Sequence, residues 1–219
     1  MELYMNEELK RQDEYVYNEI FVWNTYNLLE EDIKGRELLD IGSQYGMFTL
    51  KALDLGVKTV FCFEANIDNY KQSLKNLSSY KNVYVQNLAV VGDDKDNQIF
   101  YIDNAGGHSR IRENGILPVK SISFSKCTEL LQKGSVLKMD IEGSEHSLLY
   151  HTDPSILKKF ELIFIEIHNF EGNTIKNLID YIKNAGFKLI GEWTFYMDYP
   201  DGRRLCEDIW TFKFKRLAG

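Results

Sequence analysis

The chain has 219 residues, of which 44% are hydrophobic and 27% are charged, with only three prolines. This size and composition are typical of one globular domain and exclude a long disordered tail. The formal net charge of −7 repels polyanions on average, which disfavours nucleic acid as a partner.

The amino terminus has no basic region followed by an apolar segment, so we expect no signal peptide. No run approaches the ~18 apolar residues of a membrane span. The three cysteines are far apart and form no CxxC pair, which supports neither a disulfide framework nor a zinc site. We therefore expect a soluble, cytoplasmic protein.

Residues 1–35 form a charged, tyrosine-rich segment that stands apart from the rest of the chain. Two adjoining helical faces in this segment carry apolar side chains: Val16, Ile20 and Trp23 on one, and Val22, Tyr26 and Leu29 on the other. The pattern predicts a helical segment that packs on the core, with a lid over the substrate as the alternative. Residues 36–219 are expected to form the main domain.

From residue 36 onward, short apolar strands alternate with amphipathic helices, which predicts βαβ units and a mostly parallel sheet. Strands are expected at 36–41, 58–64, from 83, and at 135–140, 161–167, 187–193 and 208–214. Helices are expected at 46–55, 68–79, 126–133 and 154–159, and from a cap at Asn173 to Gly186. Residues 93–125 interrupt the alternation and predict an inserted hairpin.

The first strand runs into Asp40-Ile-Gly-Ser-Gln-Tyr-Gly46. Its glycines permit a tight turn and close approach of a ligand, and the next helix begins with free amides. Gln44 takes the place of the middle glycine of G-x-G-x-x-G, which disfavours NAD and an oxidoreductase. An acid at the start of such a loop suits a ligand with a positive amino group; a plain strand cap and turn is the alternative.

Glu64 ends the second strand about twenty residues after this loop, where a carboxylate can accept both hydroxyls of an adenosine ribose. The alternative is an exposed carboxylate at a strand end. The loop and Glu64 together favour a nucleoside ligand.

A third motif, Leu137-Lys-Met-Asp-Ile-Glu-Gly-Ser-Glu145, places Asp140 and Glu142 at the end of a buried strand, where a parallel sheet opens to ligands. The chain resembles the FkbM-type family of S-adenosylmethionine-dependent methyltransferases, above all in this motif followed by Leu148-Leu149. The glycine loop from Asp40 to Gly46, Phe63-Glu-Ala-Asn66 and Ile165-Glu-Ile-His168 support the resemblance. The resemblance covers residues 36 to about 170. It implies an α/β, Rossmann-like class I methyltransferase fold, with a seven-stranded, mostly parallel sheet and helices on both faces.

The resemblance also implies a set of cofactor-binding residues. Asp40, Gly42 and Gly46 would hold the methionine end and Glu64 the ribose. Asn87, Leu88 and Ala89, at the end of the third strand, would lie at the edge of the adenine. Asp140 would face the sulfonium and the acceptor. The full set is Asp40, Gly42, Ser43, Tyr45, Gly46, Glu64, Ala65, Asn66, Asn87, Ala89 and Asp140.

The activity that the resemblance implies is O-methylation of a hydroxyl on a sugar, glycan or other small metabolite. The alternatives are an RNA methyltransferase and a nucleoside-binding protein without turnover. Residues 104–110 are one candidate lining for the acceptor pocket. The last connection offers another: Trp193, Tyr196, Tyr199, Arg203 and Arg204. The identity of the acceptor and a homodimeric state stay open.

An acceptor hydroxyl must lose its proton, and two arrangements could remove it. In the first, His168 is the general base, since imidazole titrates near neutral pH. In the second, a divalent cation acidifies the hydroxyl, and oxygen-rich ligation favours Mg²⁺ or Mn²⁺. The candidate catalytic residues and metal ligands are the same four: Asp140, Glu142, Glu166 and His168. Alternation along each strand is expected to bring Asp140 and Glu142 to one side, and likewise Glu166 and His168.

Overall fold

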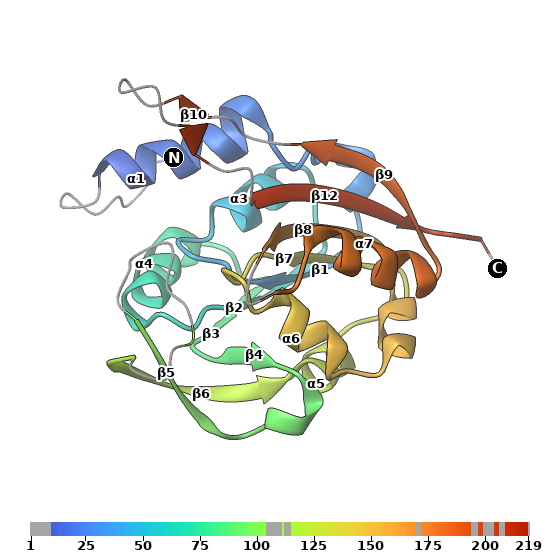
Figure 1. Cartoon of the computed structure of the whole chain (residues 1–219). Coiled ribbons are helices and arrows are strands. Elements are labelled where there is room, and N and C mark those ends of the chain that lie inside the picture. Colours follow the sequence, from blue (N-terminus) through green and yellow to red (C-terminus); the bar gives the residue numbers. More distant parts are fainter. Residues whose placement is uncertain are drawn as a thin grey trace.

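The structure is a computed structural model, and it describes residues 10–103, 111, 115–169, 172–193, 197–198, 204–205 and 209–218. For residues 10–13, 197–198, 204–205 and 209 it describes the backbone alone. Figure 1 shows a central sheet with helices packed on both of its faces. Within the described residues, no helix is long and apolar enough to cross a membrane.

The helices and strands follow the predicted alternation. The helices are α1 (Lys10–Tyr17), the π-helical turn η2 (Asn18–Trp23), α2 (Glu30–Ile33), α3 (Met47–Asp54), α4 (Ile67–Leu77), the 3₁₀ turn η3 (Asp93–Lys95), α5 (Phe124–Glu129), α6 (Glu145–Tyr150), the 3₁₀ helix η5 (Pro154–Lys159) and α7 (Ile175–Asn184). The strands are β1 (Glu37–Ile41), β2 (Thr59–Phe63), β3 (Val83–Gln86), β4 (Ala89–Val91), β5 (Ile99–Ile102), β6 (Leu117–Ser123), β7 (Ser135–Met139), β8 (Phe160–His168), β9 (Phe187–Trp193), β10 (Met197–Asp198), β11 (Arg204–Leu205) and β12 (Ile209–Arg216).

The main sheet has seven strands in the order β3-β2-β1-β7-β8-β12-β9, and β12 runs antiparallel to both of its neighbours. This confirms the predicted seven-stranded, mostly parallel sheet. The chain winds outward from β1 in one direction and from β7 in the other, so the strand order reverses between these two strands. Ligands of open α/β sheets bind at such a reversal, beyond the carboxyl ends of the strands.

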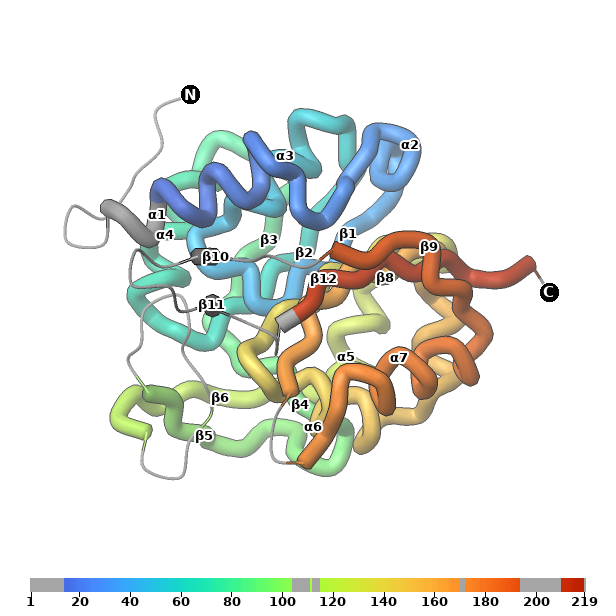
Figure 2. Tube along the Cα trace, turned by 45° about the horizontal axis from the view of Figure 1, so that its top comes forward, coloured from blue at the N-terminus to red at the C-terminus, as the bar shows by residue number. Residues whose placement is uncertain are grey.

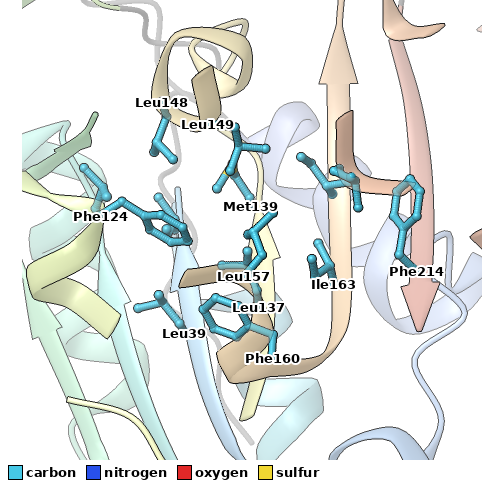
Figure 3. Packing of buried hydrophobic residues seen from close by; sticks show 14 of the residues in the cluster. Leu39, Phe124, Leu137, Met139, Leu148, Leu149, Leu157, Phe160, Ile163 and Phe214 are labelled. Atoms are coloured by element: carbon cyan, nitrogen blue, oxygen red, sulfur yellow. The ribbon is translucent and has the colours of Figure 1, made fainter. Parts of the chain in front are cut away.

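Each face of the sheet carries its own apolar core, because side chains alternate along a strand. Leu38 and Val136 face one side, where they meet residues of α3, α4 and the N-terminal segment. Leu39 and Leu137 face the other side and pack against α5, α6 and α7. Figure 3 shows this second core, with Phe124 from α5 close to the strands. Two covered faces explain why the strands read as nearly continuous apolar runs.

The predicted hairpin is present as β5 and β6, which pair antiparallel. It belongs to a separate three-stranded sheet, because β4 pairs parallel with β6. The prediction that Asn87 and Ala89 end the third strand is therefore wrong for Ala89. β3 ends at Gln86, and Ala89 begins β4 opposite Ser121.

Other local predictions differ in detail. The last helix is capped by Thr174, whose hydroxyl accepts from the amide of Asn177, and not by Asn173. The helix expected at 126–133 begins two residues earlier, because the Ser123 side chain caps it. The segment after Asp153 is capped as predicted but winds as a 3₁₀ helix.

The N-terminal segment packs along the face that α3 covers, as Figure 2 shows. Ile20, Tyr26 and Ile33 are buried in that core. A buried ion pair of 2.6 Å joins Asp32 Oδ2 to Lys213 Nζ on β12. Three residues of the predicted apolar stripe, Val22, Trp23 and Leu29, are instead exposed. The helix ends at Trp23, with Asn24 in a left-handed conformation, so the two predicted faces do not continue.

Candidate functional site

Four of the predicted site residues lie at one level on adjacent strands: three directly follow a strand, and Glu166 lies two residues before the end of β8. In the parallel register, Ile41 lies opposite Phe63 and Met139, and Met139 lies opposite Ile165. The next residue of each strand therefore falls in one row along the sheet edge. That row is Glu64, Gly42, Asp140 and Glu166, and it spans the point where the strand order reverses.

The loop from Gly42 to Gly46 depends on backbone conformations that favour glycine. Gly42 has φ +74° and Gly46 has φ +83°, and Gln44 between them also has a positive φ of 49°. A Cβ on Gly42 would lie 1.7 Å from the carbonyl oxygen of Asp140. Gly42 is therefore required because the loop lies directly against the end of β7.

Glu64 is buried, and its side chain holds two loops together. One carboxylate oxygen accepts from the Gln44 amide and the other from the Asn66 amide, each at 2.8 Å. Asn87 Nδ2 donates to the carbonyls of Glu64 and Ala65, which braces the same strand end. Burial raises the pKa of Glu64, although these amides and Lys138 oppose the rise.

Asp40 is fully buried next to a lysine that was not among the predicted site residues. Thr49 Oγ1 donates to Asp40 Oδ2 at 2.7 Å, and Lys138 Nζ lies 3.5 Å from Oδ1. Lys138 also donates to the Gly42 carbonyl at 2.6 Å and lies 3.9 Å from Asp140. Burial opposes the charge on Lys138, but the surrounding carboxylates raise its pKa on balance. Lys138 thus ties the glycine loop to the ends of β1 and β7.

The sequence contained one signal for the role of Lys138, because a lysine inside an otherwise apolar strand is unusual. A buried charge needs partners of opposite sign. Asp40 lies opposite Lys138 in the register of β1 and β7, and only that pairing identified the partner.

His168 ends β8 and is surrounded by carboxyl groups. Its Nδ1 lies 3.2 Å from Glu145 Oε1, and its Nε2 lies 3.4 Å from Glu142 Oε2 and 3.6 Å from Glu166 Oε1. Burial alone would lower the pKa of His168, but Glu145 and the other acids raise it to about 10. The surrounding carboxylates therefore favour the protonated ring, which weighs against His168 as a general base.

Asp140 and Glu142 both reach this cluster, but not by strand alternation as we expected. β7 ends at Met139, and Glu142 lies in a turn with φ +56°. Glu145 Oε1 accepts from the amides of Ile141 and Gly143, which fixes that turn. Asp140, Glu142 and His168 each bring one ligand-type atom into a group whose members lie within 4.8 Å of one another. Glu166 lies beside this group.

Glu166 has a partner that sequence reasoning did not identify. Tyr26 is buried in the N-terminal segment, and its hydroxyl donates to Glu166 Oε2 at 3.2 Å. Burial and then the charge of Asp140 raise the pKa of Glu166 well above its usual range. Burial likewise raises the pKa of Asp140, although Lys138 opposes it.

The other predicted cofactor residues occupy several environments. The Tyr45 ring lies in the apolar core, and Asn66 caps α4 by accepting from the amides of Asp68 and Asn69. Ser43 Oγ is buried and has no hydrogen-bond partner in the described part of the chain. Ala65 packs beside Ala89 on the small second sheet. Of the acceptor candidates, residues 104–110, Tyr196, Tyr199 and Arg203 lie outside the described residues, as does the side chain of Arg204.

The family model described as "Methyltransferase FkbM domain" matches residues 40–189. This range contains the glycine loop, Glu64, Lys138 and the whole acidic cluster. No curated protein matches the sequence.

Solved structures of methyltransferases share the fold. A precorrin-6y C5,15-methyltransferase from Geobacter metallireducens has a TM-score of 0.52 at 9% identity, covering 98% of this chain and 94% of that one. An rRNA methylase from Streptococcus thermophilus has a TM-score of 0.52 at 12% identity, covering 88% and 94%. A Streptococcus pneumoniae protein in complex with S-adenosyl-L-methionine has a TM-score of 0.50 at 15% identity, covering 87% and 71%. Likeness at these identities shows a common fold, and the predicted Rossmann-like class I methyltransferase fold is confirmed.

Proposed function

Because this chain belongs to the FkbM methyltransferase family, we propose that it transfers a methyl group from S-adenosylmethionine to a hydroxyl of a sugar, glycan or other small metabolite. One observation carries the proposal. The glycine loop lies so close to Asp140 that a Cβ on Gly42 would meet its carbonyl oxygen. A cofactor held by this loop would thus have its reactive end beside the acidic cluster.

The residues around the loop suit S-adenosylmethionine. Glu64 directly follows β2, and its Oε2 accepts from the Gln44 amide and has a second lone pair for a ribose hydroxyl. Its Oε1 accepts from the Asn66 amide and from Asn69 Nδ2. Ser43 offers a buried hydroxyl without a partner in the described part. Asp40 is fully buried, with Oδ2 accepting from Thr49 and Oδ1 lying 3.5 Å from the Lys138 ammonium. We therefore assign Asp40 to shaping the loop and the methionine end to the loop's own backbone and Ser43.

The charge of the site suits a cationic cofactor and a neutral acceptor. Five carboxyl groups surround two cationic side chains, Lys138 and His168; they are those of Asp40, Asp140, Glu142, Glu145 and Glu166. This excess attracts a sulfonium and repels the phosphates of RNA. The net charge of −7 acts in the same direction.

When bound, S-adenosylmethionine supplies an electrophilic methyl carbon, so that a carbon–oxygen bond forms as the carbon–sulfur bond breaks and a neutral thioether leaves. The chain has to align the acceptor oxygen with that carbon and take the hydroxyl proton. Alignment alone can contribute ~7–11 kcal/mol in favourable cases. Glu166 suits the role of proton acceptor, because Tyr26 fixes one of its carboxylate oxygens at the sheet edge.

The test incubates the full chain with methyl-labelled S-adenosylmethionine, a panel of sugars, glycans and hydroxylated metabolites, and separately RNA. We expect label in an ether linkage on a small acceptor and none in RNA. Labelled RNA alone would overturn the choice of acceptor. Binding of S-adenosylhomocysteine without transfer to any acceptor would indicate a binding protein. Glu64→Ala should abolish S-adenosylhomocysteine binding in calorimetry, whereas the exposed Asp180→Asn should not.

A further inference from the structure

We infer that Asp140, Glu142 and His168 form a binding site for one divalent transition-metal cation of the Mn²⁺ class. The site lies at the carboxyl ends of β7 and β8, beside the loop that the cofactor is proposed to occupy. Binding of the cation stands on this geometry alone, whereas its role in methyl transfer rests on the proposed function.

The spacing of the ligand atoms fits a cation. One oxygen each from Asp140 and Glu142 and one ring nitrogen of His168 lie within 4.8 Å of one another. Two ligands across an octahedral cation lie about 4.2 Å apart at ~2.1 Å bonds, and neighbouring ligands about 3.0 Å apart. His168 Nε2 lies 3.4 Å from Glu142 Oε2. Small side-chain movements would therefore bring all three atoms to bonding distance.

The orientation of His168 is an independent indication. The side chain is 3% exposed, and its Nε2 points into the cluster without a hydrogen-bond partner of good geometry among the described residues. On the opposite side of the ring, Nδ1 lies 3.2 Å from the buried carboxylate of Glu145. Ligating histidines commonly donate their other N–H to a carboxylate, which fixes the tautomer and aims the free nitrogen at the metal.

The charges around the site favour a cation over an apolar or anionic occupant. The cluster has five carboxyl groups against two cationic side chains. Its carboxylates are largely withdrawn from water, where unbalanced charge is costly. A divalent cation would balance two of these negative charges. Lys138 leans toward Asp40 and the Gly42 carbonyl, so it does not fill the space between Glu142 and His168.

The donor set identifies the class of cation. Carboxylate oxygens suit Mg²⁺, Ca²⁺ and Mn²⁺, whereas imidazole suits later transition metals. Two carboxylates with one imidazole lie between these preferences and favour Mn²⁺ over Mg²⁺. A cation held here could accept an acceptor hydroxyl in an open position and acidify it.

The test titrates MnCl₂ alone into the chelator-stripped full chain and follows the free Mn²⁺ signal by electron paramagnetic resonance. We expect one equivalent to bind, and MgCl₂ to bind at least tenfold more weakly. His168→Gln and Glu142→Gln should weaken Mn²⁺ binding at least tenfold. Glu145→Gln should weaken it about 10- to 100-fold, as expected for a group that orients a ligand. The surface variant Asp180→Asn should bind as the wild type does.

S-Adenosylhomocysteine binding, measured on the same variants without metal, serves as the check that they fold. If the wild type bound no Mn²⁺ at about 1 mM, a concentration that corresponds to a binding free energy of only about −4 kcal/mol, the cation site would be overturned. Binding that Glu142→Gln and His168→Gln leave unchanged would also overturn it. Mn²⁺ binding without methyl transfer would leave the site standing and count against the proposed function alone. Full methyl transfer in excess chelator would leave the function standing and remove the cation's role.

Discussion

Tyr26 donates a hydrogen bond of 3.2 Å to Glu166 Oε2, although the two residues are 140 positions apart in the sequence. The contact joins the N-terminal segment to the end of β8, where the acidic cluster lies. Tyr26 is also packed edge-on against Phe48 of α3, at 5.2 Å between ring centroids. The N-terminal segment is therefore part of the wall of the candidate site.

Replacing Tyr26 by Phe removes the hydroxyl and keeps the ring, and so distinguishes the contribution of the hydrogen bond from that of the packing. The aromatic packing remains, while Glu166 loses its donor, so we expect a loss of about 1.5 kcal/mol in the free energy of unfolding. The maximal rate of methyl transfer should fall about tenfold, since misplacing a reacting group can cost up to ~10²-fold. S-Adenosylhomocysteine affinity should change little. A variant with an unchanged maximal rate would show that the hydroxyl has only a structural role.

Gly42→Ala should be severely destabilising, because its Cβ would lie 1.7 Å from a backbone carbonyl. We expect a loss of at least ~4 kcal/mol, measured by urea denaturation. Gly35 offers a matched control. Its φ of +71° is close to that of Gly42, but a Cβ there would have no atom within 4 Å. Gly35→Ala should therefore cost only the ~1–2 kcal/mol of a left-handed residue. Equal losses in the two variants would contradict the close contact with Asp140.

Lys138→Met should leave the buried carboxylate of Asp40 and the partly buried carboxylate of Asp140 without this cation. Removing one partner of a buried ion pair typically costs ~3–5 kcal/mol, and we expect a loss of this size. Adding Asp40→Asn to Lys138→Met should recover part of it, because one unpaired charge disappears. Denaturation of the two single variants and the double variant gives the coupling energy. Strictly additive losses would show that the 3.5 Å approach of Lys138 to Asp40 has no energetic effect.

The contribution of Glu64 to the free energy of unfolding should decrease as the pH rises. Burial raises the pKa of Glu64 in the folded state, so the folded protein binds more protons than the unfolded chain between the unfolded and folded pKa values. In that window, the contribution of Glu64 to the free energy of unfolding decreases as the pH rises. Glu64→Gln removes this dependence. Relative to that of the wild type, the free energy of unfolding of Glu64→Gln should therefore increase as the pH rises from about 4.5.

Asp153 provides a control of opposite sign. The Ser155 amide, as its hydrogen-bond donor, lowers the pKa of Asp153. Its contribution is present above the unfolded pKa and is lost as the pH falls through the folded pKa. Asp153→Asn should therefore approach the wild type in stability at low pH. Parallel pH curves for the Glu64→Gln and Asp153→Asn variants would contradict both assignments.

The sheet and most of the residues along its edge could be predicted because their signals are local. Apolar runs predicted the strands, and parallel strands bring their carboxyl ends to one edge. The sequence therefore indicated that Gly42, Glu64 and Asp140 lie at or just beyond strand ends, and the register then showed that they share a row with Glu166. The glycine loop could be predicted for the same reason, since the residues that form a tight turn are adjacent in the chain.

Contacts within the site depended on the fold. Lys138 was visible as a charge within an apolar strand, but the register of β1 and β7 was needed to show its partner, Asp40. Glu142 reaches His168 through a turn with a positive φ, where the side-chain period of a strand no longer applies. Ala89 was assigned to the wrong strand, because a short apolar run does not show which sheet it joins.

The sequence by itself determined approximately where the strands of the main sheet end and hence which edge of the sheet carries the candidate site, because those patterns extend over only a few neighbouring positions. Tertiary structure alone decided that Tyr26 supports Glu166, that Glu145 orients His168, and that Gly42 lies against Asp140. These contacts join distant segments, and they form only when the packing of both faces fixes the register of the strands.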